Sequence, residues 1–341
     1  MCKSLFFLMF LIFQLSAQNI ISVSGTILNN TTVMIFGSGF GTKPTSSPVL
    51  WDQVDNVPSY VGLSDGATIP VGGSNPWPSP YGNSSGNNYV KYNTSDAQRG
   101  VSTAQYKVTN QKFGYLDGLT WQATNYTYIS WWWRTTSNVS GETHSSKFLR
   151  MSDATDEVYK TFSWTQLQAY VYNDPNYCSN VWNSWNGNPN NWNFLEVWFD
   201  RGGNSWTIRI NGRTHLSTSW GCTSGFYMNE CWKLGFDGGG VSPPAITWWM
   251  DDIYIDNSFA RVMIGDNSNY SNCTHLEMQI PEEWSNTEIK INFNQGSFSN
   301  NASVYLYVID SNGRVNNSGF PINIGQSSDM PRKPSGIVVS P

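Results

Sequence analysis

The chain has little charge, little histidine and almost no helical periodicity. Charged residues make up 13% of the 341 residues, against about 25% in typical soluble domains, and there are 3 histidines. The net charge is −5 and Lys and Arg do not cluster, which argues against a nucleic-acid partner because phosphate neutralisation needs concentrated cations. Disorder is disfavoured as well, since aromatic residues reach 15%.

Long apolar runs are missing apart from one at the N-terminus. Residues 1–17 combine Lys3, the apolar run Leu5–Phe13 and a small-residue cleavage site ending at Ala17. This pattern is typical of a secretory signal and is too short to span a bilayer. No later segment reaches membrane-spanning length. We therefore predict a secreted or cell-surface protein without a membrane span.

Cysteine pairs with metal-ligand spacing are also absent. Without a CxxC pair, and with scattered histidines, a zinc site is disfavoured. In an oxidising compartment one or two disulfides are expected, and three full pairings remain open. The four cysteines beyond residue 17 are Cys178, Cys222, Cys231 and Cys273.

What the sequence does contain is the pattern of a β protein. Short runs of Val, Ile, Tyr, Trp and Phe alternate with Gly, Asn, Ser and Pro, as in a sandwich or jelly roll. Asn211-Gly212, between two such runs, predicts a type I′ hairpin. Residues 58–88 are predicted to be loop. Further strands are expected at residues 33–36, 49–51, 89–92, 126–134, 147–151, 166–172, 193–200, 230–236, 246–255, 260–264, 288–293 and 304–310.

Both ends of the chain resemble parts of one small immunoglobulin-like domain, the IPT/TIG domain. The resemblance rests on Gly37, Gly39 and Gly41 around Phe40, and on a Trp-Ser-x-Thr-x-Ile strand at residues 284–289. Two strands cannot bury a sandwich core. We therefore expect residues 18–50 and 262–326 to fold together around an insertion at 51–261, with a flexible tail at 327–341. Two separate small domains are the alternative.

The inserted region resembles the concanavalin-A-like lectin/glucanase jelly roll. The residues that carry this resemblance are Tyr128–Arg134, Lys147–Arg150, Phe194–Phe199, the Asn211-Gly212 hairpin and Trp248–Asp256. Taken whole, the order of segments resembles exported bacterial proteins that combine the two modules. The resemblance implies an all-β fold, with a jelly roll inserted in or joined to an immunoglobulin-like sandwich. It reports fold rather than activity.

Catalytic patterns are incomplete. Glucanases of this fold carry a Glu-x-Asp-x-x-Glu strand, which is absent, and Glu196 and Asp200 would lie about 13 Å apart. Arg150, Gln168 and Tyr170 partly resemble the strands of jelly-roll alginate lyases. Gln, however, stands where that family has its catalytic His, and its Tyr-Phe-Lys-Ala-Gly signature is missing. A polysaccharide lyase acting on an acidic glycan therefore remains an alternative only.

The aromatic excess, with 17 Trp and 17 Tyr, favours sugar binding, because planar rings stack on the apolar faces of pyranoses. We predict a non-catalytic carbohydrate-binding or adhesion protein, with a structural surface or appendage protein as a second alternative. The Asn-rich stretch 177–192 is expected to be a long loop that exposes two of its Trp residues. The predicted glycan contacts are Trp132, Arg134, Arg150, Gln168, Tyr170, Tyr172, Trp182 and Trp185.

A calcium site at Asp251 and Asp252 is a further expectation, because hard carboxylate oxygens suit that ion. Packing or capping roles for the two residues are the alternative. No other cofactor is predicted.

Overall fold

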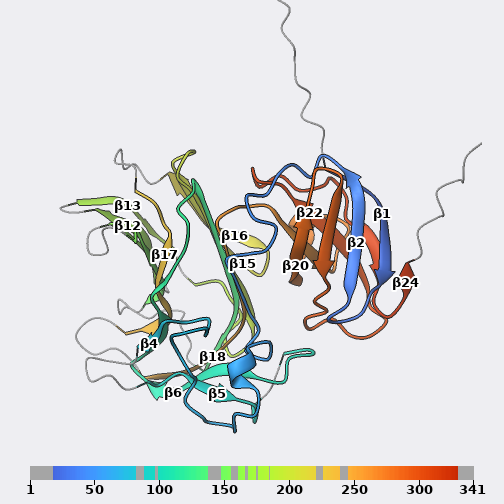
Figure 1. Ribbon diagram of the computed structural model, residues 1–341. Helices are drawn as coiled ribbons and strands as arrows, with labels where there is room; N and C mark the ends of the chain where they lie inside the picture. The colour runs from blue at the N-terminus through green and yellow to red at the C-terminus, as the bar shows by residue number, and fades with distance from the viewer. Residues whose placement is uncertain are drawn as a thin grey trace, which may run out of the picture.

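The computed structural model describes residues 18–81, 88–96, 99–136, 147–154, 160–165, 168–173, 176–183, 185–219, 226–238 and 245–328. The described chain is all-β and built of sandwiches, as predicted (Figure 1). The expected leader at 1–17 lies outside the described residues. Among those that are described, no helix is long and apolar enough to cross a membrane.

Two antiparallel sheets form the jelly roll, and we call them the outer and the middle sheet. The outer sheet runs in the order β13-β12-β11-β10-β17-β7-β4, with β8 beside β17. Its strands are β4 (Ser79–Tyr81), β7 (Phe113–Asp117), β8 (Leu119–Thr120), β10 (Lys147–Ser152), β11 (Lys160–Thr165), β12 (Gln168–Asn173), β13 (Asn176–Trp182) and β17 (Glu230–Asp237).

The middle sheet runs in the order β16-β15-β14-β9-β18-β6-β5, with β3 beside β18. A short 3-10 helix, η1 (Pro58–Tyr60), follows β3. The strands of the middle sheet are β3 (Leu50–Asp52), β5 (Lys91–Asn93), β6 (Gln105–Gln111), β9 (Tyr126–Thr135), β14 (Asn193–Asp200), β15 (Ser205–Ile210), β16 (Arg213–Ser219) and β18 (Ile246–Asp256).

Both ends of the chain meet in a separate sandwich, which we call the terminal sandwich. Its strand order is β23-β22-β19-β20-β21-β2-β1-β24. β2 pairs with β21, so residues 32–36 lie beside residues 288–292. The strands are β1 (Asn19–Thr26), β2 (Thr32–Ser38), β19 (Arg261–Gly265), β20 (Leu276–Trp284), β21 (Glu288–Asn292), β22 (Ser303–Ile309), β23 (Phe320–Asn323) and β24 (Ser327–Ser328), with a 3-10 helix η2 (Tyr270–Asn272).

Strand β20 joins the two halves of the terminal sandwich. Its first half pairs with β19 and its second half pairs with β21, with a register shift between Pro281 and Glu283. Phe40 fills the core between the halves and is fully buried. Gly39 and Gly41 flank it with φ of 74° and 72°, a backbone conformation that favours glycine. At Gly37, a Cβ would lie 2.5 Å from the Phe40 ring.

Three apolar layers result from period-two alternation. Trp131 and Trp133 of β9 share a face, as their spacing requires, and both point into the core between the outer and middle sheets. Trp132 points the other way, into a separate cluster between the middle sheet and the terminal sandwich. The middle sheet is therefore covered on both faces, and in Figure 1 it lies between the outer sheet and the terminal sandwich.

Several sequence-based boundaries need correction. Residues 177–182, expected as the start of a loop, belong to the edge strand β13, and Ser327 and Ser328, expected in the tail, pair with β1. Strands β6, β7, β8, β11, β20 and β23 were not predicted. The 58–88 segment contains η1 and β4. The Asn211-Gly212 hairpin is confirmed, with φ of 51° and 74° at its two central residues.

Candidate functional site

A β-bulge shapes the face of the outer sheet that is turned away from the core, which we call the outer face. Arg150 of β10 is opposite Lys233 of β17, and Met151 is opposite Cys231, so Trp232 is the extra residue. Cys231 points into the core. On the outer face, the guanidinium of Arg150 and the Nζ of Lys233 both lie over the Trp232 ring. The bulge therefore places a ring and a cation side by side.

Arg150 is held by three contacts on this face. Its guanidinium carbon lies 4.2 Å from the centroid of the Trp232 ring, and its Nε donates to Ser163 Oγ at 3.1 Å. Its Nη1 lies 4.0 Å from Asp237 Oδ2, at the limit of an ion pair. Among the described side chains, its terminal nitrogens make no hydrogen bond, so they can donate to a ligand.

Lys233 completes this cluster. Its Nζ lies 2.9 Å from Asp237 Oδ2, and it also lies 4.6 Å from the Tyr115 ring centroid. Lys147 is nearby: burial lowers the pKa of its ammonium, Asp237 raises it, and the positive charges of Arg150 and Lys233 lower it further. Among the described side chains, three cations thus meet a single carboxylate here.

The other predicted contacts on the outer sheet are placed by register. Tyr170 is opposite Ser163, which is opposite Arg150, so the backbone of Tyr170 lies two strands, or about 10 Å, from that of Arg150. Gln168 and Tyr172 lie on the same strand, β12. The side chains of Gln168, Tyr170 and Tyr172 fall outside the described part of the structure.

Trp182 is exposed, as predicted. It is 67% exposed at the end of the edge strand β13 and is opposite Gln168, while the preceding Val181 packs on the core. Cross-strand partners share a face. Trp182 and Trp232 therefore lie on one face, and four strand spacings of about 4.8 Å separate their strands by roughly 19 Å.

Trp185 was expected to be exposed, and this is wrong: it is 6% exposed. Its ring lies 5.5 Å from that of Phe148 and 6.1 Å from that of Trp164, inside the jelly-roll core. The polar residues around Trp185 suggested a solvated loop, but a single ring can be buried while its neighbours stay in water. Trp185 therefore supports the fold.

Trp132 is also removed from solvent, because the terminal sandwich covers the middle sheet. It is 7% exposed, with the Arg99 guanidinium 4.4 Å from its ring centroid and the Phe194 ring at 5.4 Å. Its Nε1 donates to Glu277 Oε2 at 3.2 Å. The ring is enclosed between two bodies, so it cannot stack on a glycan as we expected.

Arg134 lies on the middle sheet, away from Arg150. Its guanidinium stacks on Trp249 at 4.3 Å, and Lys107 lies 5.3 Å from the same ring. Asp96 pairs with Lys107 and accepts from Trp249 Nε1 at 3.2 Å. Since the jelly-roll core separates the two sheets, Arg134 and Arg150 cannot contact one glycan segment.

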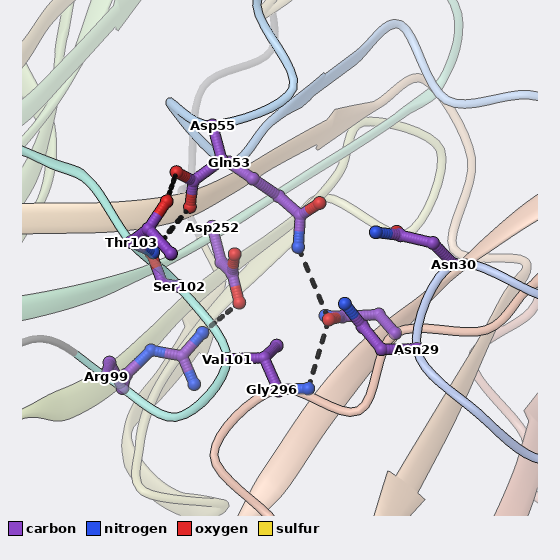
Figure 2. A pocket seen from close by; sticks show the side chains of 11 residues that line it. Asn29, Asn30, Gln53, Asp55, Arg99, Val101, Ser102, Thr103, Asp252 and Gly296 are labelled. Atoms are coloured by element: carbon purple, nitrogen blue, oxygen red, sulfur yellow. Dashed lines mark hydrogen bonds and ion pairs between the residues drawn. The ribbon is translucent and has the colours of Figure 1, made fainter.

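Asp251 and Asp252 lie where the jelly roll meets the terminal sandwich. Asp252 ion-pairs with Arg99, and Figure 2 shows the two side chains directed at each other in a polar pocket of about 230 Å³. Asp251 Oδ1 accepts from the Asp252 N–H at 2.8 Å, and burial raises the pKa of Asp251. Among the described residues, no group of three His, Cys, Asp or Glu side chains could hold a metal ion.

The region where the jelly roll meets the terminal sandwich, which we call the junction, brings together a Ser, a His and a Glu side chain. These are the residue types of a nucleophilic triad, and the sequence did not reveal them. His275 Nε2 lies 2.8 Å from Ser297 Oγ and 2.7 Å from Glu277 Oε1. In a Ser-His-acid triad the acid contacts the other ring nitrogen. Here Ser and Glu share one nitrogen, and Ser297 Oγ also donates to Glu277 at 2.8 Å. This arrangement supports Glu277 rather than activating Ser297.

Glu196, considered above as a glycosidase carboxylate, is fully buried in the junction. It lies 3.8 Å from Arg261 Nη2 and 3.7 Å from Arg209 Nη1, and it accepts from Tyr128 at 2.9 Å. These partners neutralise it within the fold, so it is not available to a substrate.

Two of the four cysteines are free, which limits the disulfides that the chain can form. Cys231 and Cys273 are both free and buried, in the jelly-roll core and in the junction. All three full pairings require these two thiols, so a two-disulfide protein is contradicted. The side chains of Cys178 and Cys222 lie outside the described part.

The described geometry is that of an all-β protein with a jelly roll that carries a cluster of cations on one sheet face. No protein-family model matches the chain, and no curated protein matches it. Domain 4 of AbnA, an extracellular arabinanase from Geobacillus stearothermophilus solved with arabinotriose, is 14% identical with a TM-score of 0.35, covering 52% of this chain and 80% of that one.

The binding domain of botulinum neurotoxin serotype G is 12% identical with a TM-score of 0.33, covering 64% of this chain and 68% of its own. The serotype D ligand-binding domain, solved with N-acetylneuraminic acid, is 10% identical with a TM-score of 0.34, covering 68% and 70%.

Proposed function

We propose that the protein binds glycans through the outer face and that it has no catalytic role. The observation that carries this proposal is the pairing of Trp232 with Arg150 on a sheet face, with the exposed Trp182 on the same face. An exposed ring offers a stacking surface for a pyranose, and a fixed guanidinium offers hydrogen-bond donors to its oxygens. The positions of Gln168, Tyr170 and Tyr172 lie between the two rings in strand order.

The separation of the rings favours a chain of sugars over a single one. Roughly 19 Å between the strands of Trp182 and Trp232 is longer than one sugar ring, so one polysaccharide could contact both. The exposed Trp182 side chain at the sheet edge contributes little to packing, so Trp182→Ala should leave the fold intact. The two rings can therefore be tested separately.

A glycan array with the full chain tests the proposal. Trp182→Ala and Trp232→Ala should each lower retention of the bound glycan about tenfold, in line with a loss of 1–2 kcal/mol, roughly, per stacked ring. Arg134→Ala is the matched control, because Arg134 makes a similar ring contact on the other sheet. No retention of any glycan at high protein concentration would refute the proposal, as would equal losses in Arg134→Ala.

A polysaccharide lyase acting on an acidic glycan is a second candidate, favoured by one observation. The register aligns Arg150, Ser163 and Tyr170 in one row across three strands. A cation that neutralises a uronate and a nearby proton carrier are what that reaction needs. Incubation with alginate, hyaluronan and pectate should then raise ultraviolet absorbance from the new double bond. Flat traces on all three would remove this candidate.

Export and an IPT/TIG identity for the terminal sandwich belong to the same proposal. The apolar run Leu5–Phe13 supports export, and the glycines around the buried Phe40 support the domain type. A glycan-binding protein would act outside the cell, where polysaccharides are found. Mass spectrometry of the exported protein should give an N-terminus at Gln18, whereas an intact Met1 would contradict cleavage.

A further inference from the structure

The outer face carries an imbalance of charge that the protein as a whole does not have. The chain has a net charge of −5, yet Lys147, Arg150 and Lys233 surround one carboxylate, Asp237. Among the described side chains this gives +3 from the cations and −1 from Asp237, a local charge of +2. Such an excess is costly to keep partly buried, because like charges repel each other more strongly away from water.

The three cations are not equally satisfied. Lys233 holds Asp237 at 2.9 Å, whereas Arg150 reaches the same carboxylate only at 4.0 Å. Burial lowers the pKa of the partly buried Lys147, and the nearby positive charges of Arg150 and Lys233 lower it further. Because Asp237 is the one carboxylate that the described part of the chain places against these three cations, an additional anion would be stabilised between Arg150 and Lys147.

We propose that the glycan bound at the outer face is anionic, and that one of its carboxylate or sulfate groups lies among Lys147, Arg150 and Lys233. This inference rests on the proposed function and names the class of its ligand. Arg150 has its Nε on Ser163 and its guanidinium over the Trp232 ring, and among the described residues its terminal nitrogens make no hydrogen bond, so they can donate to the anion. The aromatic rings of Trp232 and Trp182 contact the sugar itself.

Affinity electrophoresis of the full chain tests this inference with alginate, dextran sulfate and neutral dextran at low and high salt. The two anionic polymers should retard the protein, salt should weaken retardation, and dextran should leave migration unchanged. Retardation by alginate alone assigns a carboxylate, and retardation by dextran sulfate alone assigns a sulfate. Both results support the inference.

A pair of double variants separates a specific site from general charge. Arg150→Ala with Lys233→Ala should weaken anionic binding by at least about tenfold. Arg134→Ala with Lys107→Ala removes the same charge from a similar cluster around Trp249 and should leave binding unchanged. Equal weakening in both pairs would overturn the inference. If the first pair fails to fold, Lys147→Met replaces it, and unchanged anionic binding in that variant would overturn the inference.

The inference and the proposed function fail in different ways. Binding of dextran as strong as that of alginate would overturn the anionic class and leave glycan binding intact. Absence of retardation by all three polymers, together with an empty glycan array, would overturn both.

Discussion

At the scale of single residues, Glu277 is a tightly held carboxylate at the junction of the jelly roll and the terminal sandwich. Burial raises its pKa, but Arg99 at 2.7 Å and the hydrogen bond of His275 outweigh this and hold it at about 2. Ser297 adds its N–H and its hydroxyl at 2.8 Å each. The ionised form of Glu277 is therefore favoured by folding.

The lowered pKa of Glu277 makes the free energy of unfolding depend on pH in the acidic range. The folded pKa of Glu277 lies below the ordinary 4.5, so its contribution is present above pH 4.5 and is lost as the pH falls toward 2. We expect the wild type to have a larger free energy of unfolding than Glu277→Gln at pH 6. The difference, measured by urea denaturation, should shrink by about 3 kcal/mol between pH 6 and pH 2. Glu288→Gln, at an exposed position, is the control. A difference that is constant with pH would contradict this account.

At the scale of elements, the hairpin between β15 and β16 links local turn chemistry to domain packing. Gly212 has φ 74°, and a Cβ there would lie 2.8 Å from the Cys273 carbonyl oxygen of the terminal sandwich. Asn211 Oδ1 accepts from the Phe194 N–H at 2.9 Å, which fixes the hairpin to β14. The turn sequence thus serves both the hairpin and the contact with the other body.

Two glycine substitutions separate these roles. Gly66 has φ 77° and no atom within 4 Å of an added Cβ, so Gly66→Ala should cost only the backbone strain, about 1–2 kcal/mol. Gly212→Ala adds a clash with Cys273 and should cost roughly 3 kcal/mol or more. Urea denaturation of both variants measures the difference. Equal costs would mean that the hairpin does not press on the terminal sandwich.

At the scale of the whole molecule, a continuous apolar cluster joins the jelly roll to the terminal sandwich. Trp132 and Tyr254 of the middle sheet pack with Met278 and Tyr307 of the terminal sandwich. Buried ion pairs reinforce the contact, among them Lys43 with Asp256 at 2.6 Å. We therefore expect the two bodies to unfold together, because neither can bury its share of this cluster alone.

A pair of tryptophan substitutions tests this coupling. Trp132→Ala empties part of the junction and should destabilise the protein by about 3–5 kcal/mol. Trp182→Ala, at an exposed sheet edge, should change stability by no more than about 0.5 kcal/mol. Thermal unfolding followed by circular dichroism gives both values. A small effect of Trp132→Ala would show that the junction contributes little to stability.

Alternation along single strands was enough to predict much of this architecture. The β class, the Asn211-Gly212 turn and the shared face of Trp131 and Trp133 follow from side-chain period and backbone φ, which are local properties. The exposure of Trp182 also followed from its polar neighbours. These features depend on interactions between residues close in the chain.

Packing between distant segments decided the rest. Alternation assigned Trp132 to a face but could not reveal that residues from 262 onward cover it, and it could not place Arg134 and Arg150 on opposite sheets. The bulge that turns Trp232 outward depends on pairing between β10 and β17, about 80 residues apart. A side chain's direction is set by its own strand, whereas its exposure is set by what the rest of the chain places against it.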